Sequence, residues 1–175
     1  MQEQQAHLYL VGMMGCGKST VGPLLADLLG RPFYDLDEII VAYAGKAISD
    51  IFREEGEIVF REWESFVLRE LADCPAGVAA TGGGIVLAED NRRRLKRTGR
   101  CAWLDASPEV LVSRVGDGSS RPVLSGQLSI ERVEELHAER APMYRDVAGI
   151  RIDTAHQDPR QLAQALAGWF MGRES

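Results

Sequence analysis

The clearest chemistry in this sequence lies in residues 12–20, Gly-Met-Met-Gly-Cys-Gly-Lys-Ser-Thr. They match the G-x-x-x-x-G-K-[ST] pattern of a phosphate-binding loop. The glycines permit a tight turn whose backbone N–H groups can approach an anion closely. Lys18 could reach the β- and γ-phosphates of a nucleotide, and the Ser19 hydroxyl could ligate an accompanying Mg²⁺. The loop therefore predicts nucleoside triphosphate binding.

Two carboxylates follow a short strand predicted over residues 32–35. Asp35 and Asp37 alternate along the end of this strand, so we expect them to point to different faces. Asp35 could support Mg²⁺ through a water molecule. Asp37 could accept the proton of a substrate hydroxyl, or hold that hydroxyl in line. The alternative for Asp37 is an N-cap of a helix predicted over residues 38–44.

Arg61 and Glu64 lie three residues apart in a helix predicted over residues 57–72. Their pairing would fix the plane of the guanidinium, which suits a substrate carboxylate. The alternative is an ordinary ion pair on the surface, which contributes little. The sequence therefore leaves an anion-binding role and a surface role open for Arg61.

Two further arginines could bind anionic groups. Arg121 lies in residues 116–126, where flanking glycines predict a hinged lid. From there it could cover a triphosphate and stabilise charge that develops at the γ-phosphoryl group. Arg140 begins the stretch Arg-Ala-Pro-Met-Tyr and is a second candidate for anion binding. A solvated surface arginine remains the alternative for both.

The elements that must position these residues alternate between strand and helix, which predicts an α/β domain with a mainly parallel, five-stranded sheet. Residues 7–11 predict a buried strand, and residues 18–29 a helix that ends at Gly30 and carries a kink at Pro23. Ser49 is expected to cap a helix over residues 50–55. The next two predicted elements are a helix over 57–72, with apolar positions Ile58, Val59, Phe66, Val67 and Leu71, and a central strand over 77–81 that ends in Gly82, Gly83 and Gly84. A basic helix over 89–98, a strand over 100–105 and a helix that starts at Ser107-Pro108 follow. The last predicted elements are a helix over 130–145, a strand over 149–153, and a final helix through Phe170 that is capped by Asp158.

Composition and charge limit the possible functions. The 175 residues, 45% of them hydrophobic, indicate one globular domain. The net charge of −6 argues against a general nucleic-acid binder, and the basic helix over 89–98 is better explained as a solvated face. An odd number of cysteines (Cys16, Cys74 and Cys101) without metal-like spacing indicates reduced thiols. With no apolar signal segment or membrane-spanning run, we expect a cytoplasmic protein without membrane partners. We also expect a monomer without nucleic-acid partners.

Other classes of nucleotide-binding protein fit the sequence poorly. A GTPase would require an Asn/Thr-Lys-x-Asp motif, which the chain lacks. A large ATPase normally has an apolar strand that ends in Asp, whereas the strand over 77–81 ends in glycines. The chain is also shorter than the usual motor cores. A kinase that phosphorylates a small molecule is the favoured class.

Several motifs, taken in their order and spacing, resemble the shikimate kinase family over residues 7–170. They are Phe33-Tyr-Asp-Leu-Asp37, Glu57-Ile-Val-Phe-Arg-Glu-Trp-Glu64, Thr81-Gly-Gly-Gly84, Arg121-Pro-Val-Leu124 and Arg140-Ala-Pro-Met-Tyr144. The resemblance implies ATP-dependent phosphorylation of the 3-hydroxyl of shikimate, on the chorismate route to aromatic amino acids. It also implies a three-layer α/β/α fold like that of nucleoside monophosphate kinases, with a substrate-binding segment over about 35–64 and a lid over 116–126.

The same resemblance implies roles for individual residues. On the substrate side they are Asp37 for the shikimate hydroxyls, Arg61 and Arg140 for the carboxylate, Gly83 for a backbone contact, and Ile48 and Phe60 for an apolar wall. On the nucleotide side they are Gly15, Cys16, Gly17, Lys18, Ser19 and Thr20 in the loop, Arg121 over ATP, Arg114 and Gln157 beside adenine, and Ser19 and Asp35 for Mg²⁺. Lys18, Asp37 and Arg121 would be catalytic. Relatives can carry Arg at position 157, and Pro23 also departs from the family pattern.

Two alternatives follow from the same residues. Another phosphate-loop kinase, acting on gluconate or a nucleoside monophosphate, would share the fold and the loop. A non-catalytic nucleotide-binding regulator would keep the loop and lose turnover. The Asp-Leu-Asp, Phe-Arg-x-x-Glu and triple-glycine motifs favour shikimate over the first, and the complete set of chemical groups argues against the second.

Overall fold

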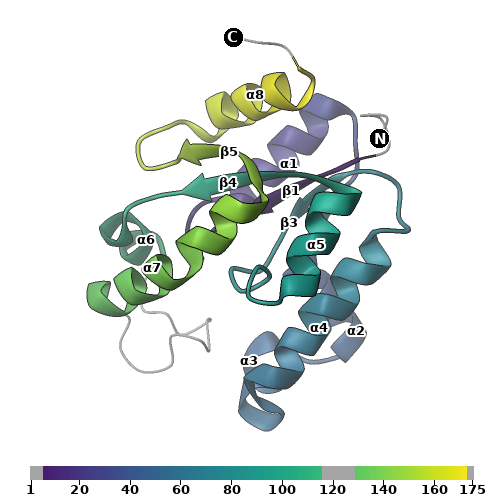
Figure 1. Ribbon diagram of the computed structural model, residues 1–175, viewed down its shortest axis with the longest axis vertical. Helices are drawn as coiled ribbons and strands as arrows, with labels where there is room; N and C mark the ends of the chain where they lie inside the picture. The colour runs from purple at the N-terminus through teal and green to yellow at the C-terminus, as the bar shows by residue number, and fades with distance from the viewer. Residues whose placement is uncertain (1–5, 116–128, 173–175) are drawn as a thin grey trace.

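Five parallel strands form one sheet at the centre of the molecule, in the order β2-β3-β1-β4-β5 (Figure 1). The computed structural model describes residues 6–115 and 129–172. The predicted α/β class with a five-stranded parallel sheet is confirmed. The strand predicted to be central, β3, lies beside the middle strand, β1. The strands are β1 (His7–Val11), β2 (Phe33–Asp35), β3 (Val78–Ala80), β4 (Gly99–Asp105) and β5 (Ala148–Asp153).

Helices cover both faces of this sheet. Figure 1 shows α5 and α7 in front of the strands and α1 behind them, with α8 beside α1. The helices are α1 (Lys18–Leu29), α2 (Leu36–Ala44), α3 (Ile48–Glu54), α4 (Gly56–Leu71), α5 (Glu89–Thr98), α6 (Pro108–Val115), α7 (Ile130–Val147) and α8 (Pro159–Phe170). Within the described ranges, none of these helices combines the length and apolar character needed to cross a membrane.

The core explains the composition of the inner strands. Every residue of β1 and β3 is buried, as expected for strands covered on both faces, and apart from His7 their sequences are apolar rather than alternating. Helix α1 approaches the sheet closely at Gly22, where an added Cβ would overlap the Phe33 ring. Because the strands are parallel, the carboxyl ends of β1, β2 and β3 meet at one edge, where open α/β sheets bind ligands.

Two predictions about helix starts are wrong. Asp35 ends β2, and α2 begins at the next residue, so Asp35 and Asp37 do not alternate along a strand. Asp35 is the N-cap of α2, because its Oδ1 accepts the Asp37 N–H at 3.0 Å; the capping alternative therefore belongs to Asp35 and not to Asp37. Ser49 lies inside α3, whose N-cap is Ala47.

Helix α1 continues through Pro23 as one element and ends at Gly30, which has the left-handed conformation expected of a terminating glycine. In α4, Val67 and Leu71 are buried as predicted, but Ile58 is 78% exposed, so the apolar face does not extend to the start of the helix. All three cysteines are free, as predicted.

Candidate active site

The phosphate loop joins β1 to α1 and has the predicted turn geometry. Gly12, Gly15 and Gly17 have φ angles of 140°, 77° and 101°, a region that side chains other than glycine rarely adopt. The Lys18 ammonium is buried inside the loop. Its Nζ donates to the carbonyls of Gly12 at 2.7 Å and Met13 at 2.8 Å, and lies 3.3 Å from the Cys16 sulfur. The loop thus holds a positive charge beside its own backbone.

A cavity of about 470 Å³ opens at this loop. It is lined by both predicted carboxylates, Asp35 and Asp37, so the expectation that they point to different faces is wrong. The fold places them on one cavity because the chain turns from strand to helix between them. The other predicted nucleotide residues that line it are Gly15, Cys16, Gly17, Lys18, Ser19, Thr20, Arg114 and Gln157.

Ser19 and Asp35 make a pair of oxygen ligands at the edge of the cavity. The Ser19 hydroxyl donates to Asp35 Oδ2 at 2.9 Å. Hydroxyl and carboxylate oxygens are suited to a hard cation such as Mg²⁺, which usually takes few protein ligands and completes its shell with water and substrate phosphates. In the described part of the chain, no three His, Cys, Asp or Glu side chains gather as a metal cluster. The donor set thus fits a Mg²⁺ that arrives with a nucleotide.

Arg61 is held between two carboxylates of its own helix, α4. Its Nη1 donates to Glu64 Oε2 at 2.5 Å, and its Nη2 donates to Glu57 Oε1 at 2.8 Å. The Glu64 side chain is only 2% exposed and that of Arg61 is 20% exposed. The predicted pairing of Arg61 with Glu64 is confirmed, and the alternative of a surface ion pair is wrong for it.

Two of the three glycines after β3, Gly82 and Gly84, leave the space that this pair occupies. An added Cβ at Gly82 would overlap the Glu64 carboxylate, and one at Gly84 would overlap the Arg61 guanidinium. A Cβ at Gly83 would meet only ordinary contacts, 3.5 Å from the Gly12 carbonyl oxygen and the Met14 nitrogen. Because these glycines have no side chains, α4 and the phosphate loop can both pack closely against this turn.

Burial and charge oppose each other at Glu64. Burial raises the pKa of the Glu64 carboxyl to about 7, although the Arg61 guanidinium lowers it. At Arg61, burial alone would lower the pKa of the guanidinium, but the Glu64 and Glu57 carboxylates outweigh burial and raise it. Glu64 thus titrates near neutral pH, whereas Arg61 stays charged.

Arg140 reaches the triple glycine from α7. It is 3% exposed, so the alternative of a solvated arginine is wrong for it, and its Nη1 would lie 3.7 Å from a Cβ added at Gly83. A Cβ added at Gly82 would lie 3.4 Å from Asp37 Oδ1. The predicted substrate residues Asp37, Arg61, Gly83 and Arg140 are therefore brought together around three glycines next to the phosphate loop.

Arg114 and Gln157 line the same cavity as the phosphate loop. Arg114 donates to the Thr154 carbonyl at 2.6 Å and the Ala155 carbonyl at 3.1 Å. Gln157 Nε2 donates to the Asp153 carbonyl at 2.8 Å. The Arg114 bonds fix the segment after β5 against α6, beside the part of the cavity predicted for adenine. Arg121 and the predicted lid over 116–126 lie outside the described residues.

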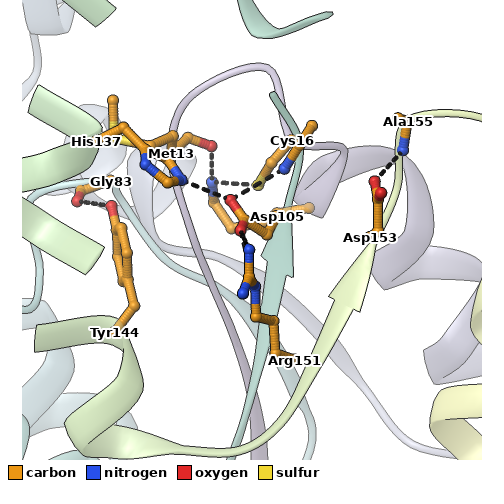
Figure 2. Close-up of polar contacts among 11 residues, drawn as sticks. Met13, Cys16, Gly83, Asp105, His137, Tyr144, Arg151, Asp153 and Ala155 are labelled. Atoms are coloured by element: carbon orange, nitrogen blue, oxygen red, sulfur yellow. Dashed lines mark hydrogen bonds and ion pairs between the residues drawn. The ribbon is translucent and has the colours of Figure 1, made fainter. Parts of the chain in front are cut away.

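One polar cluster was missed by sequence reasoning. Asp105, at the end of β4, accepts hydrogen bonds from His137 Nε2 at 2.8 Å and from Arg151 Nη2 at 2.6 Å (Figure 2). Arg151 also lies over the Trp103 ring, 4.7 Å from its centre. The partners are 32 and 46 residues from Asp105 in sequence, so only the fold brings them together. An aspartate that ends an apolar strand was the available signal.

The sheet, the phosphate loop and the arginine and carboxylate groups beside it define a phosphate-loop kinase of small molecules. The family model described as shikimate kinase matches residues 14–169. The chain belongs to the shikimate kinase family and is an ATP-dependent kinase.

Individual relatives agree with this assignment. The chain is 46% identical to a shikimate kinase of Rhodopirellula baltica over 156 residues, which cover 87% of this chain and 83% of the relative. It is 47% identical to one of Symbiobacterium thermophilum over 163 residues, 92% of each chain. A solved structure of the Acinetobacter baumannii shikimate kinase in complex with shikimate matches with a TM-score of 0.93 at 39% identity, covering 98% of this chain and 96% of that one.

Proposed function

We propose that this chain transfers the γ-phosphoryl group of ATP to the 3-hydroxyl of shikimate, giving shikimate 3-phosphate and ADP for the chorismate route to aromatic amino acids. The observation that carries the proposal is the convergence of Arg61, Arg140 and Asp37 on the triple glycine beside the phosphate loop. Shikimate has one carboxylate and several hydroxyls, so it needs guanidinium groups for the former and a carboxylate for the latter.

The two arginines are prepared for a carboxylate in different ways. Glu57 and Glu64 hold the Arg61 guanidinium in one plane. Arg140 Nε is buried and, among the described residues, has no hydrogen-bond partner. Buried donors are nearly always satisfied in the working state of a protein, so a carboxylate ligand accounts for this nitrogen. Ile48 and Phe60 would supply apolar surface for the ring.

Asp37 and Lys18 would serve the transfer itself. Asp37 would orient the acceptor hydroxyl and take its proton, while Lys18 would move from the loop carbonyls to the β- and γ-phosphates. Ser19 and, through water, Asp35 would hold Mg²⁺, which supplies charge neutralisation at the phosphates. Orientation by two arginines converts the encounter of two substrates into a step between positioned groups. Arg121 over the triphosphate remains a prediction, as do a single domain over 1–175, a monomer and a cytoplasmic location.

The experiment is a coupled ADP-release assay with Mg-ATP, in which shikimate, gluconate and AMP are supplied separately beside a control without acceptor. Release with shikimate alone is the expected result. Release with gluconate or AMP would keep the kinase class and overturn the substrate. If none of the three acceptors raises ADP release above the control, in protein that is folded and binds ATP, the result would instead support the non-catalytic regulator.

A further inference from the structure

The buried hydroxyl of Tyr144 connects two parts of the acceptor site. It donates to the Gly83 carbonyl at 2.5 Å, across 61 residues of sequence (Figure 2). The Tyr144 side chain is fully buried, and its ring lies 5.6 Å from that of Trp103 at an angle of 32°. A hydroxyl in this environment must have a partner, because burying it unpaired would cost free energy.

The bond to Gly83 differs from those of its neighbours. The Gly82 carbonyl accepts from Ile85 N at 3.2 Å, and the Gly84 carbonyl accepts from Leu87 N at 3.0 Å, so both bonds stay within the turn. The Gly83 carbonyl is instead tied to α7. Consecutive glycines have the greatest backbone freedom, and a tie from a rigid helix therefore reduces the number of conformations open to this turn.

The same helix face carries Arg140, one turn before Tyr144. A third residue of this face, His137, is bonded to Asp105 at the end of β4. Arg140 therefore lies between two points at which α7 is hydrogen-bonded to the sheet side of the molecule. Figure 2 shows both contacts, with Tyr144 pointing to Gly83 and His137 pointing to Asp105.

We infer that Tyr144 is a positioning residue, whose hydroxyl fixes the Gly83 turn against the helix that carries Arg140 and so sets the distance between two groups that bind the acceptor. The inference rests on the proposed function, because that function assigns Gly83 and Arg140 to the acceptor. Tyr144 acts through Gly83 and through the Arg140 side chain, with which its hydroxyl also interacts, and needs no contact with substrate. The nucleotide is bound by the phosphate loop, so its binding should not depend on this bond.

Tyr144→Phe is the test, since it removes one oxygen and keeps the ring. We expect the KM for shikimate to rise about three- to tenfold, the range that corresponds to one lost hydrogen bond, with the KM for ATP unchanged. Tyr34→Phe is the matched control. The Tyr34 hydroxyl also donates to a backbone carbonyl, that of Pro75 at 3.0 Å, but this hydrogen bond is exposed to solvent. This variant should keep both KM values.

The possible outcomes separate the inference from the function. If the parent turns over shikimate and Tyr144→Phe keeps the parental KM for shikimate, the inference is overturned and the function stands. If both KM values rise together, the tyrosine has a general structural role and the inference is overturned as well. A parent that does not phosphorylate shikimate removes the proposed function and this inference with it.

Thermal unfolding of each variant, with and without ATP, separates loss of fold from loss of acceptor binding. Should Tyr144→Phe unfold, Tyr144→Met repeats the test, because methionine fills a buried space flexibly and also lacks the donor. A raised KM for shikimate with a normal KM for ATP is again the expected result.

Discussion

The Ser19 hydroxyl and the Asp35 carboxylate lie 2.9 Å apart, and the second oxygen of Asp35 accepts the Asp37 N–H. The Asp35 carboxylate therefore contacts both Ser19, a proposed metal ligand, and Asp37, the residue proposed to bind the acceptor hydroxyl. It also caps α2. The two duties can be separated, because an N-cap needs only an oxygen whereas metal binding depends on the charge.

Asp35→Asn should keep the cap and lose the charge. We expect near-parental thermal stability, because Asn caps as well as Asp, and a Mg²⁺ requirement shifted to higher concentration. Asp35→Ala should show the same shift and also lose about 1 kcal/mol of stability. Activity measured against Mg²⁺ concentration at constant ATP is the readout. An unchanged Mg²⁺ requirement in both variants would exclude Asp35 from the metal site.

Lys18→Ala should abolish most phosphoryl transfer without unfolding the chain. The Lys18 ammonium contacts loop carbonyls and is proposed to move from them to the nucleotide phosphates, so its loss should lower kcat by roughly 10²–10³-fold or more. Lys96→Ala is the control, since Lys96 pairs with Asp146 on the surface. Steady-state kinetics and circular dichroism of both variants check the expectation. Near-parental turnover in Lys18→Ala would remove the lysine from the reaction.

The glycine turn should respond differently at adjacent positions. Gly84→Ala forces a Cβ into the Arg61 guanidinium, so Arg61 must move, and we expect the KM for shikimate to rise at least about tenfold. Gly83→Ala adds a Cβ at ordinary contact distance and should have a smaller effect. The ratio of the two KM values is the measurement. If the KM for shikimate rises equally in both variants, or more in Gly83→Ala, the position of Arg61 does not depend on the missing side chain at Gly84.

The sequence predicted the fold well because its signals are local. The strand over residues 7–11 and the helix over 18–29 coincide with β1 and α1, since an apolar run, a glycine loop and a terminating Gly30 lie next to one another. The pairing of Arg61 with Glu64 was likewise predictable from helical spacing. The same spacing could not indicate that Glu64 would be buried.

What the sequence could not predict depends on where the chain turns or meets a distant segment. Asp35 and Asp37 were expected on opposite faces because the strand was taken to continue through them, whereas α2 begins between them. The contacts of Tyr144 with Gly83 and of His137 with Asp105 join residues that are distant in sequence. Their residue types have many possible partners, and only the packing of α7 on the sheet selects one.

The Asp105 cluster should contribute to stability more than to activity. Asp105 is 6% exposed and accepts from the Ala106 N–H, His137 and Arg151. Asp105→Ala should lower the free energy of unfolding by about 2–4 kcal/mol, because several hydrogen bonds to a buried charge are lost. Arg151→Ala should cost about 1 kcal/mol or less, since its side chain is 60% exposed. Urea unfolding measures both, and equal losses would contradict this ranking.

Stability should depend on pH through Glu64. Its folded-state pKa is raised to about 7 from the ordinary value of 4.5, so between these pH values the folded chain binds a proton that the unfolded chain releases. This group therefore makes the free energy of unfolding fall as pH rises from about 4.5 to 7, by no more than about 1.4 kcal/mol per pH unit. Glu64→Gln removes the titration, so its unfolding free energy should fall less steeply than that of the parent over this range. Glu62→Gln, an exposed change in the same helix, is the control. Urea unfolding at several pH values gives the curves, and a Glu64→Gln curve parallel to that of the parent would show that Glu64 does not titrate in this window.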